Sequence, residues 1–305
     1  MSGAAAARVP LGKSGVVVSP LGMGTNLWGR AGNPRPELRE VFDAALSRGI
    51  SLFDTAEIYA GGGSERTVSL CLKGLQPGRE RPAVLSKFFP LPWRLGKARL
   101  IDALRRSLDR LQLASLDVYL IHFPWSPVPI ETWVDALADA VEAGLVRAVG
   151  VSNYNAAQVR RAHGVLASRD IPLACNEVEL SLARQGVLGN GTLAVCRELG
   201  VTVIAYRPLA LGRLTGRPPG SARGWRRLAA AGMRTDAPLA KVVREIGRAH
   251  GGKTPAQVAL NWVLSKGALP IPGATSVSHL DENAGALGWN LTDGEVAALD
   301  RASSG

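Results

Sequence analysis

Eight short apolar runs recur along this chain, and each of them ends in polar or reactive residues. Helix-length amphipathic segments separate the runs. A strand-helix unit repeated eight times, with polar groups at the strand ends, is typical of a (β/α)8 TIM barrel, an α/β fold whose active site faces one rim. In chain order the runs are LGMGTNLW, SLFD, AVLSK, DVYLIH, AVGVSN, PLACNE, VTVIAY and LPIPGATS.

Length and composition fit a single domain over residues 1–305. A (β/α)8 barrel takes about 250 residues, which leaves room for loops and a terminal hairpin. The hydrophobic share of 46% and the charged share of 20% are ordinary for a soluble globular protein. The segment 8–18 predicts a β-hairpin, and helices are expected at about 36–49, 64–74, 97–112, 130–143, 155–167, 188–199, 238–250 and 278–287.

The chain is strongly basic, with a formal net charge of +11. Such a charge is compatible with nucleic-acid binding. Most of the basic residues are arginines spread over helical segments such as RLIDALRRSLDRL, where acidic residues neighbour them. We therefore expect solvated helix faces and no nucleic-acid partner, although the charge would also attract an anionic dinucleotide to the rim.

The cysteines, the apolar runs and the N-terminal segment indicate where in the cell the protein is expected. Cys71, Cys175 and Cys196 are odd in number and lack metal-ligand spacing, which predicts reduced core residues and no metal site. The chain has no run of about 18 apolar residues, so we expect no membrane span. The opening MSGAAAARVP lacks the apolar core of a signal peptide. These features predict a cytoplasmic protein; they leave the oligomeric state open and are compatible with a monomer.

The polar strand ends supply the groups that carbonyl reduction needs. A tyrosine hydroxyl can give the carbonyl oxygen a proton, but its unperturbed pKa of about 10 is high for that task. A lysine ammonium beside the phenol lowers that pKa, a carboxylate holds the lysine, and a histidine orients the carbonyl. The residues that match these four roles are Asp54, Tyr59, Lys87 and His122.

The motifs around these residues resemble those of the aldo-keto reductase superfamily over essentially the whole chain. The matching segments are FDTAEIYAGGGSE, VLSK, LIHFP, GVSNY, IAYRPLALGRLTG and IPGATSVSHLDEN. The resemblance implies a (β/α)8 barrel, an extended NADP(H) cofactor bound without a Rossmann domain, and reduction of a carbonyl to an alcohol. It also implies that Tyr59 is the general acid, that Lys87 and Asp54 tune it, and that His122 helps to orient the substrate.

The same resemblance implies cofactor contacts after three of the predicted strands. Ser152 and Asn153 resemble the pair that holds the nicotinamide carboxamide, and Tyr206 resembles the aromatic residue that stacks on the nicotinamide ring. The residues expected to follow the pyrophosphate are Arg207, Leu209, Gly212 and Arg213. The residues expected around the adenosine phosphate are Gly273, Ser276, His279, Glu282 and Asn283.

Two positions depart from the family pattern. Glu177 stands where the family usually has glutamine, and a carboxylate accepts hydrogen bonds but cannot donate one unless it is protonated. If it faces the carboxamide, we expect cofactor binding to be weaker or differently posed; the alternative is that Glu177 points away and Asn176 or another group meets the cofactor. Ala274, Thr275 and His279 occupy positions where many relatives carry the Lys or Arg partners of the 2'-phosphate. The segment IPGATSVSHL resembles pyridoxal-reductase-like members that use NADPH, so we expect a moderate preference for NADPH.

Three tryptophans are expected on loops at the active rim: Trp28, Trp93 and Trp125. Aromatic walls suit a planar or apolar substrate. The segment 207–237, rich in Gly, Pro and Arg, follows the seventh strand and is placed to fold over a ligand. The chain stops soon after its last predicted helix, so we expect no C-terminal tail over the pocket.

The favoured interpretation is an NADPH-dependent reductase of a small aldehyde or ketone, with Tyr59 as the proton donor. Two alternatives stay open. One is a regulatory barrel that binds NADPH and hardly turns it over. The other is a reductase of a sugar-nucleotide intermediate or a natural-product ketone.

Overall fold

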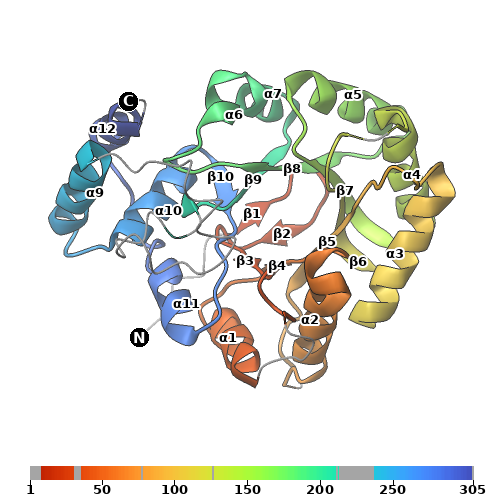
Figure 1. The fold of residues 1–305 in the computed structure, drawn as a ribbon, viewed down its shortest axis with the longest axis horizontal. Coiled ribbons are helices and arrows are strands. Elements are labelled where there is room, and N and C mark those ends of the chain that lie inside the picture. Colours follow the sequence, from red (N-terminus) through yellow and green to blue (C-terminus); the bar gives the residue numbers. More distant parts are fainter. Residues whose placement is uncertain are drawn as a thin grey trace.

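Eight parallel strands, each bonded to the next in chain order, form the central sheet (Figure 1). The computed structural model describes residues 8–30, 36–76, 78–125, 127–210, 212 and 237–303. The strands are β3 (Met23–Gly24), β4 (Leu52–Asp54), β5 (Ala83–Phe88), β6 (Leu116–Ile121), β7 (Val146–Ser152), β8 (Leu173–Glu179), β9 (Thr202–Tyr206) and β10 (Ala268–Pro270).

Hydrogen bonds between the first and last strands close the sheet. The Gly22 amide donates to Pro270 O over 3.0 Å, and the Gly24 amide donates to Pro272 O over 3.1 Å. A Cβ on Gly24 would lie 2.8 Å from Ile271 O, so this approach requires a glycine. The closed parallel sheet with helices between its strands confirms the predicted (β/α)8 barrel.

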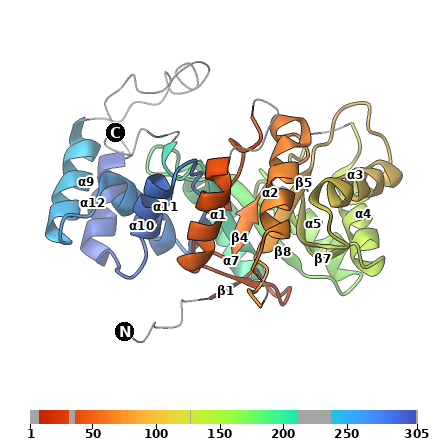
Figure 2. The same cartoon turned by 90° about the horizontal axis from the view of Figure 1, so that it is seen from below.

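The helices surround the strands, as Figures 1 and 2 show. They are α1 (Pro36–Ser47), α2 (Gly63–Lys73), α3 (Lys97–Leu111), α4 (Ile130–Glu142), α5 (Ala156–Ala167), α6 (Gly186–Gly189), α7 (Thr192–Leu199), α9 (Ala237–Ala249), α10 (Pro255–Ser265), α11 (Val277–Ala284) and α12 (Asp293–Ser303). A 3-10 turn, η1 (Tyr59–Gly62), precedes α2.

The helix predictions were incomplete at three places. The predicted helix 188–199 is divided into α6 and α7, and Gly191 adopts a left-handed φ of 80° between them. Helices α10 and α12 were not predicted. The sequence did carry a signal for α10, because Thr254 and Gln257 form a capping box around Pro255 in the first turn.

The predicted hairpin at 8–18 is confirmed. Strands β1 (Val9–Pro10) and β2 (Val17–Val18) pair antiparallel and lie across the centre of the ring of strands in Figure 1. Leu11, Val16 and Val18 pack against the inward side chains of the barrel, among them Leu52 and Leu85. This contact covers the end where the strands begin, so the polar strand ends lie at the opposite rim.

A second apolar layer joins the outer face of the barrel to its helices. Phe53 from β4 and Phe42 from α1 have ring centroids 4.6 Å apart, and Phe88 from β5 lies 4.9 Å from Trp133 of α4. All four residues are almost completely buried. Since burial of each such side chain stabilises the fold by about 1.5–3 kcal/mol, these contacts hold the strand ends in place.

Candidate active site

Lys87 is the buried centre of the predicted catalytic group. Its side chain has no exposed surface, and its ammonium forms an ion pair with Asp54 at the end of β4. The same ammonium donates to Thr55 O over 3.1 Å. Lys87 Nζ lies 5.2 Å from the centroid of the Tyr59 ring. Lysine, carboxylate and phenol are therefore adjacent.

His122 completes this group from the strand next to Lys87. It directly follows β6, and its amide donates to Phe88 O over 2.9 Å. The His122 and Tyr59 ring centroids are 5.8 Å apart, with the rings nearly perpendicular at 80°. The structure thus brings together the four side chains that the strand ends supply.

A salt bridge ties the loop of Tyr59 to the loop after β5. The carboxylate of Glu57 pairs with Arg94 and accepts a hydrogen bond of 2.7 Å from the Phe89 amide. Arg94 also donates to Phe89 O over 3.0 Å. This ion pair was not predicted from the sequence. Its members lie two residues before Tyr59 and seven after Lys87, and no local pattern links them.

Burial decides the protonation of Tyr59 and His122. Desolvation raises the pKa of Tyr59, and this outweighs the opposing effect of the Lys87 charge. Lys87 lowers the pKa of Tyr59 as expected, but the net change in this pKa is upward. Desolvation, with a contribution from Lys87, lowers the pKa of His122 to about 3. At neutral pH Tyr59 therefore keeps its proton and His122 is an uncharged imidazole.

Glu177 faces Lys87, a contact that was not predicted from the sequence. The residue is 1% exposed, and its Oε2 lies 3.2 Å from Lys87 Nζ. That oxygen nevertheless has no partner with hydrogen-bond geometry among the described residues. Desolvation, followed by repulsion from Asp54, raises the pKa of Glu177 to about 8.

Asn153 lies at the centre of a hydrogen-bond network beside His122. It has a left-handed φ of 64°, and its Nδ2 donates to His122 O and to Ser152 Oγ, each over 3.0 Å. The Tyr206 hydroxyl donates to Asn153 Oδ1 over 2.8 Å. Ser152 Oγ donates to Glu177 O over 2.9 Å. Three of the four residues expected at the nicotinamide, Ser152, Asn153 and Tyr206, are thus in one network, and the fourth, Glu177, contributes only its backbone carbonyl.

The loop after β9 is described only in part. Arg207 has a φ of 50° and pairs with Glu179 at 3.6 Å. Leu209 is half-buried against the core, and Gly212 has a φ of 95°. Arg213 lies outside the described residues.

The residues expected at the adenosine phosphate gather at α11. Ser276 caps this helix by accepting a hydrogen bond of 3.3 Å from the His279 amide. Gly273 is exposed, whereas His279 and Glu282 are half-buried. Asn283 is 3% exposed, and its Nδ2 has no hydrogen-bond partner among the described residues. A buried amide without a partner fits a bound acceptor group.

Aromatic rings surround His122 at the rim. Phe123 stacks on His122 at 4.9 Å, and Phe89 meets it edge-on at 5.5 Å. Trp125 lies 4.6 Å from Phe123 and remains 54% exposed. Trp93 is 72% exposed. The wall therefore includes Phe89 and Phe123, which the motifs SKFF and IHFP carry directly after the strand ends.

Trp28 is a correction to the predicted wall. It has no exposed surface, and its indole N–H donates to Ala274 O over 2.9 Å. Its ring lies 6.1 Å from Phe53 in the apolar layer outside the barrel. A buried ring with its one donor satisfied links the first loop to the last, and it offers no surface to a substrate.

Comparison with known proteins decides the family. The profile described as Aldo/keto reductase family matches residues 20–304. The chain belongs to the aldo/keto reductase family. This confirms the predicted family and makes the protein an oxidoreductase.

Named reductases and solved structures lie among the relatives of this aldo/keto reductase. It is 39% identical to the chloroplastic pyridoxal reductase of Arabidopsis thaliana, over 94% of this chain and 83% of that protein. It is 34% identical to a methylglyoxal reductase of Escherichia coli, over 95% and 93%. A Klebsiella pneumoniae aldo/keto reductase in complex with NADP and acetate has 31% identity and a TM-score of 0.74, over 95% and 93% of the two chains. A thermostable aldo-keto reductase has 30% identity and a TM-score of 0.81, over 97% and 99%.

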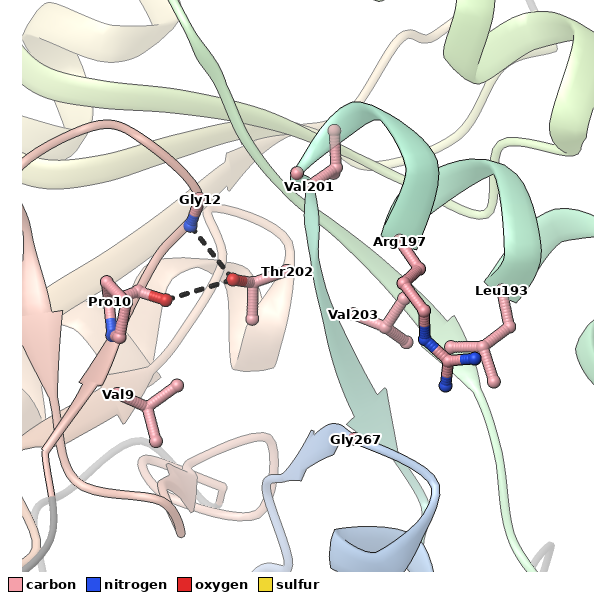
Figure 3. A pocket seen from close by; sticks show the side chains of 10 residues that line it. Val9, Pro10, Gly12, Leu193, Arg197, Val201, Thr202, Val203 and Gly267 are labelled. Carbon is pink, nitrogen blue, oxygen red and sulfur yellow. Dashed lines mark hydrogen bonds between the residues drawn. The ribbon is translucent and has the colours of Figure 1, made fainter.

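Within the described part of this aldo/keto reductase, no helix has the length and apolar character to cross a membrane, and no group of three metal-ligating side chains occurs. A cavity of about 280 Å³ lies beside the hairpin, at the end where the strands begin (Figure 3). Thr202 anchors the hairpin there by accepting from the Gly12 amide and donating to Pro10 O. This cavity is therefore at the opposite end of the barrel from Tyr59.

Proposed function

We propose that this aldo/keto reductase reduces an aldehyde or ketone to an alcohol with NADPH, and that Tyr59 donates the proton. The observation that carries the proposal is the position of Lys87. It is fully buried between the carboxylate of Asp54 and the ring of Tyr59, and a neutral His122 borders the same ring.

The residues present suit an NADP cofactor. The network of Ser152, Asn153 and Tyr206 lies at the rim next to Tyr59, where a nicotinamide is expected. The capped N-terminus of α11 and the Asn283 amide, which has no hydrogen-bond partner in the part of the chain that the structure describes, suit an adenosine phosphate. The Klebsiella pneumoniae relative named as a complex with NADP supports this assignment.

The roles of the side chains follow from their charges. The bound cofactor supplies a hydride to the carbonyl carbon. Tyr59 gives its phenolic proton to the carbonyl oxygen and becomes a phenolate, which the Lys87 ammonium stabilises. Asp54 keeps Lys87 charged and in place. His122, uncharged at neutral pH, offers a hydrogen bond that orients the carbonyl.

The aromatic wall favours planar carbonyl substrates. Phe89, Phe123 and Trp125 form a cluster of rings beside His122, and the Arabidopsis relative is named a pyridoxal reductase. We therefore propose aromatic aldehydes of the pyridoxal type as the first substrate class to test. The cytoplasmic location and the monomeric state remain predictions from the sequence.

A carbonyl panel tests the function. NADPH oxidation is measured with pyridoxal, an aromatic aldehyde, methylglyoxal and a simple ketone, for the parent protein and Tyr59→Phe. We expect turnover by the parent, a loss of about 10²–10⁴-fold in the variant, and nearly equal NADPH affinity for both. NADPH binding without oxidation by any carbonyl would contradict the proposal and favour the regulatory barrel.

A further inference from the structure

Three ionisable side chains converge inside the barrel: Lys87, Asp54 and Glu177. The proposed proton donation uses Lys87 and Asp54 but not Glu177. Lys87 has 0% of its surface exposed, Asp54 3% and Glu177 1%. Lys87 pairs with Asp54, and Glu177 Oε2 lies 3.2 Å from the same ammonium. One cation therefore faces two carboxyl groups.

Charge balance requires that one carboxyl of this cluster keeps a proton. If all three groups were ionised, the cluster would hold a net negative charge away from water, and an uncompensated buried charge is strongly destabilising. Burial raises the pKa of both carboxyl groups. Asp54, however, accepts a hydrogen bond from Lys87, whereas Glu177 Oε2 has no partner with hydrogen-bond geometry among the described residues. The proton therefore belongs on Glu177.

The other groups that face Glu177 do not supply the missing positive charge. Tyr59 from η1, Tyr206 from β9 and Cys175 on its own strand are the remaining titratable neighbours. Burial raises the pKa of each of the three, so all are neutral when Glu177 titrates. The charges that act on Glu177 are those of Asp54 from β4 and Lys87 from β5.

We propose that Glu177 is a positioning residue that must stay protonated for reduction, and that its ionisation switches reduction off by adding negative charge beside Lys87 and Tyr59. This inference rests on the proposed function.

The reason lies in the charge that the reaction creates. Tyr59 releases its proton to the carbonyl oxygen while the carbonyl carbon gains a hydride from the reduced nicotinamide, and the phenolate later regains a proton from water. With Glu177 neutral, the phenolate forms beside a cluster in which the positive charge of Lys87 and the negative charge of Asp54 cancel. With Glu177 ionised, it forms beside a cluster that is already negative, and the pKa of Tyr59 rises further.

The test compares pH profiles of three proteins. Reduction rates and NADPH dissociation constants are measured from well below to well above pH 8 for the parent, Glu177→Gln and Glu179→Gln. The first substitution replaces the carboxyl group with a neutral amide of the same size. Glu179 is the matched control, since it projects to the same face of β8 and pairs with Arg207.

We expect the rates of the parent and Glu179→Gln to fall by about tenfold for each pH unit above about 8. The rate of Glu177→Gln should be flat over this range. The NADPH dissociation constant of each protein should stay constant through the transition. In the cofactor-free parent, the infrared carbonyl band of a protonated carboxylic acid should disappear through the same pH range, and Glu177→Gln should lack it.

Several results would overturn the inference. They are equal slopes in parent and Glu177→Gln, a parent rate that does not change with pH, or a pH dependence that appears in NADPH affinity and not in the rate. The parent profile and band need no variant, so a poorly folded Glu177→Gln would still leave the inference testable. A protein that has the band but reduces no carbonyl would contradict the proposed function and leave the protonation of Glu177 intact.

Discussion

The hydroxyl of Tyr206 donates a hydrogen bond of 2.8 Å to Oδ1 of Asn153. This bond joins the end of β9 to the loop after β7. Asn153 has a left-handed φ of 64°, and its Nδ2 also donates a hydrogen bond to His122 O. The ring expected to stack on the nicotinamide therefore also fixes the side chain expected to bind its carboxamide.

Removing this hydroxyl should weaken cofactor binding without removing the ring. Tyr206→Phe should raise the NADPH dissociation constant by about threefold to tenfold, since a hydrogen bond contributes about 0.5–1.5 kcal/mol. Tyr206→Leu should bind NADPH more weakly still, because it also loses the ring. Fluorescence titration of NADPH measures both, and a leucine variant that binds as well as the phenylalanine variant would contradict the stacking role.

Lys87→Met should abolish reduction and destabilise the fold. It leaves Asp54 and Glu177 buried without a cation, and breaking a buried pair costs about 3–5 kcal/mol of unfolding free energy. We expect a loss of about 10²–10⁴-fold in kcat/KM. Lys97→Met is the control, because Lys97 is a half-exposed lysine that pairs with Asp135 and Asp139 on the surface. An exposed pair contributes about 0–1 kcal/mol, so urea unfolding should separate the variants, and retained activity in Lys87→Met would refute the assignment.

Burial of His122 should make the protein less stable in acid. The folded state keeps His122 uncharged down to about pH 3, whereas the unfolded chain binds a proton below 6.5. Between these values the unfolded state holds the extra proton, so the free energy of unfolding falls as the pH falls, by up to about 1.4 kcal/mol per pH unit. His122→Gln should lose this part of the slope, and His163→Gln, a half-buried position on α5, should keep it. Urea unfolding at stepped pH measures it, and equal slopes in parent and His122→Gln would contradict a buried neutral histidine.

Trp125→Ala should discriminate between substrates. Trp125 packs on Phe89 and Phe123, and an aromatic contact contributes about 0.5–1.5 kcal/mol beyond area burial. We expect KM for an aromatic aldehyde to rise by about tenfold, with a smaller change for methylglyoxal. Trp93→Ala, which alters a residue 72% exposed, should have the weaker effect. Equal changes for both substrates would show that Trp125 only supports the loop.

NADPH should be preferred to NADH, but moderately. Thr275, which precedes α11, and His279 within that helix stand where many relatives carry the Lys or Arg partners of the 2'-phosphate. We therefore expect a single charge-assisted phosphate contact from another residue, and such a contact contributes about 1.5–3 kcal/mol. The ratio of kcat/KM should therefore be about tenfold to a few hundredfold. Comparing the two cofactors in the parent and His279→Ala measures the ratio, which the variant should lower. A preference for NADH in the parent would refute the prediction.

The positions of the strand ends could be predicted from the sequence. A buried strand shows as an apolar run, and parallel strands deliver the residues after each run to one rim, so Asp54, Lys87 and His122 could be placed together before any contact was known. The repeated unit also predicted the barrel and its hairpin. Helices α10 and α12 were not predicted, because the repeated unit has one helix for each strand and these two helices are additional to it.

Only the tertiary structure decided the contacts between elements. Trp28 and Ala274 are 246 positions apart, so nothing local indicates that the tryptophan is buried and hydrogen-bonded there. Glu177 was recognised as unusual, but its approach to Lys87 depends on the barrel bringing β8 and β5 across from each other. Local patterns specify strands and helices because backbone geometry repeats over a few residues. Burial, protonation and the direction of a side chain depend on neighbours that are distant in the chain, and these exist only once the barrel has closed.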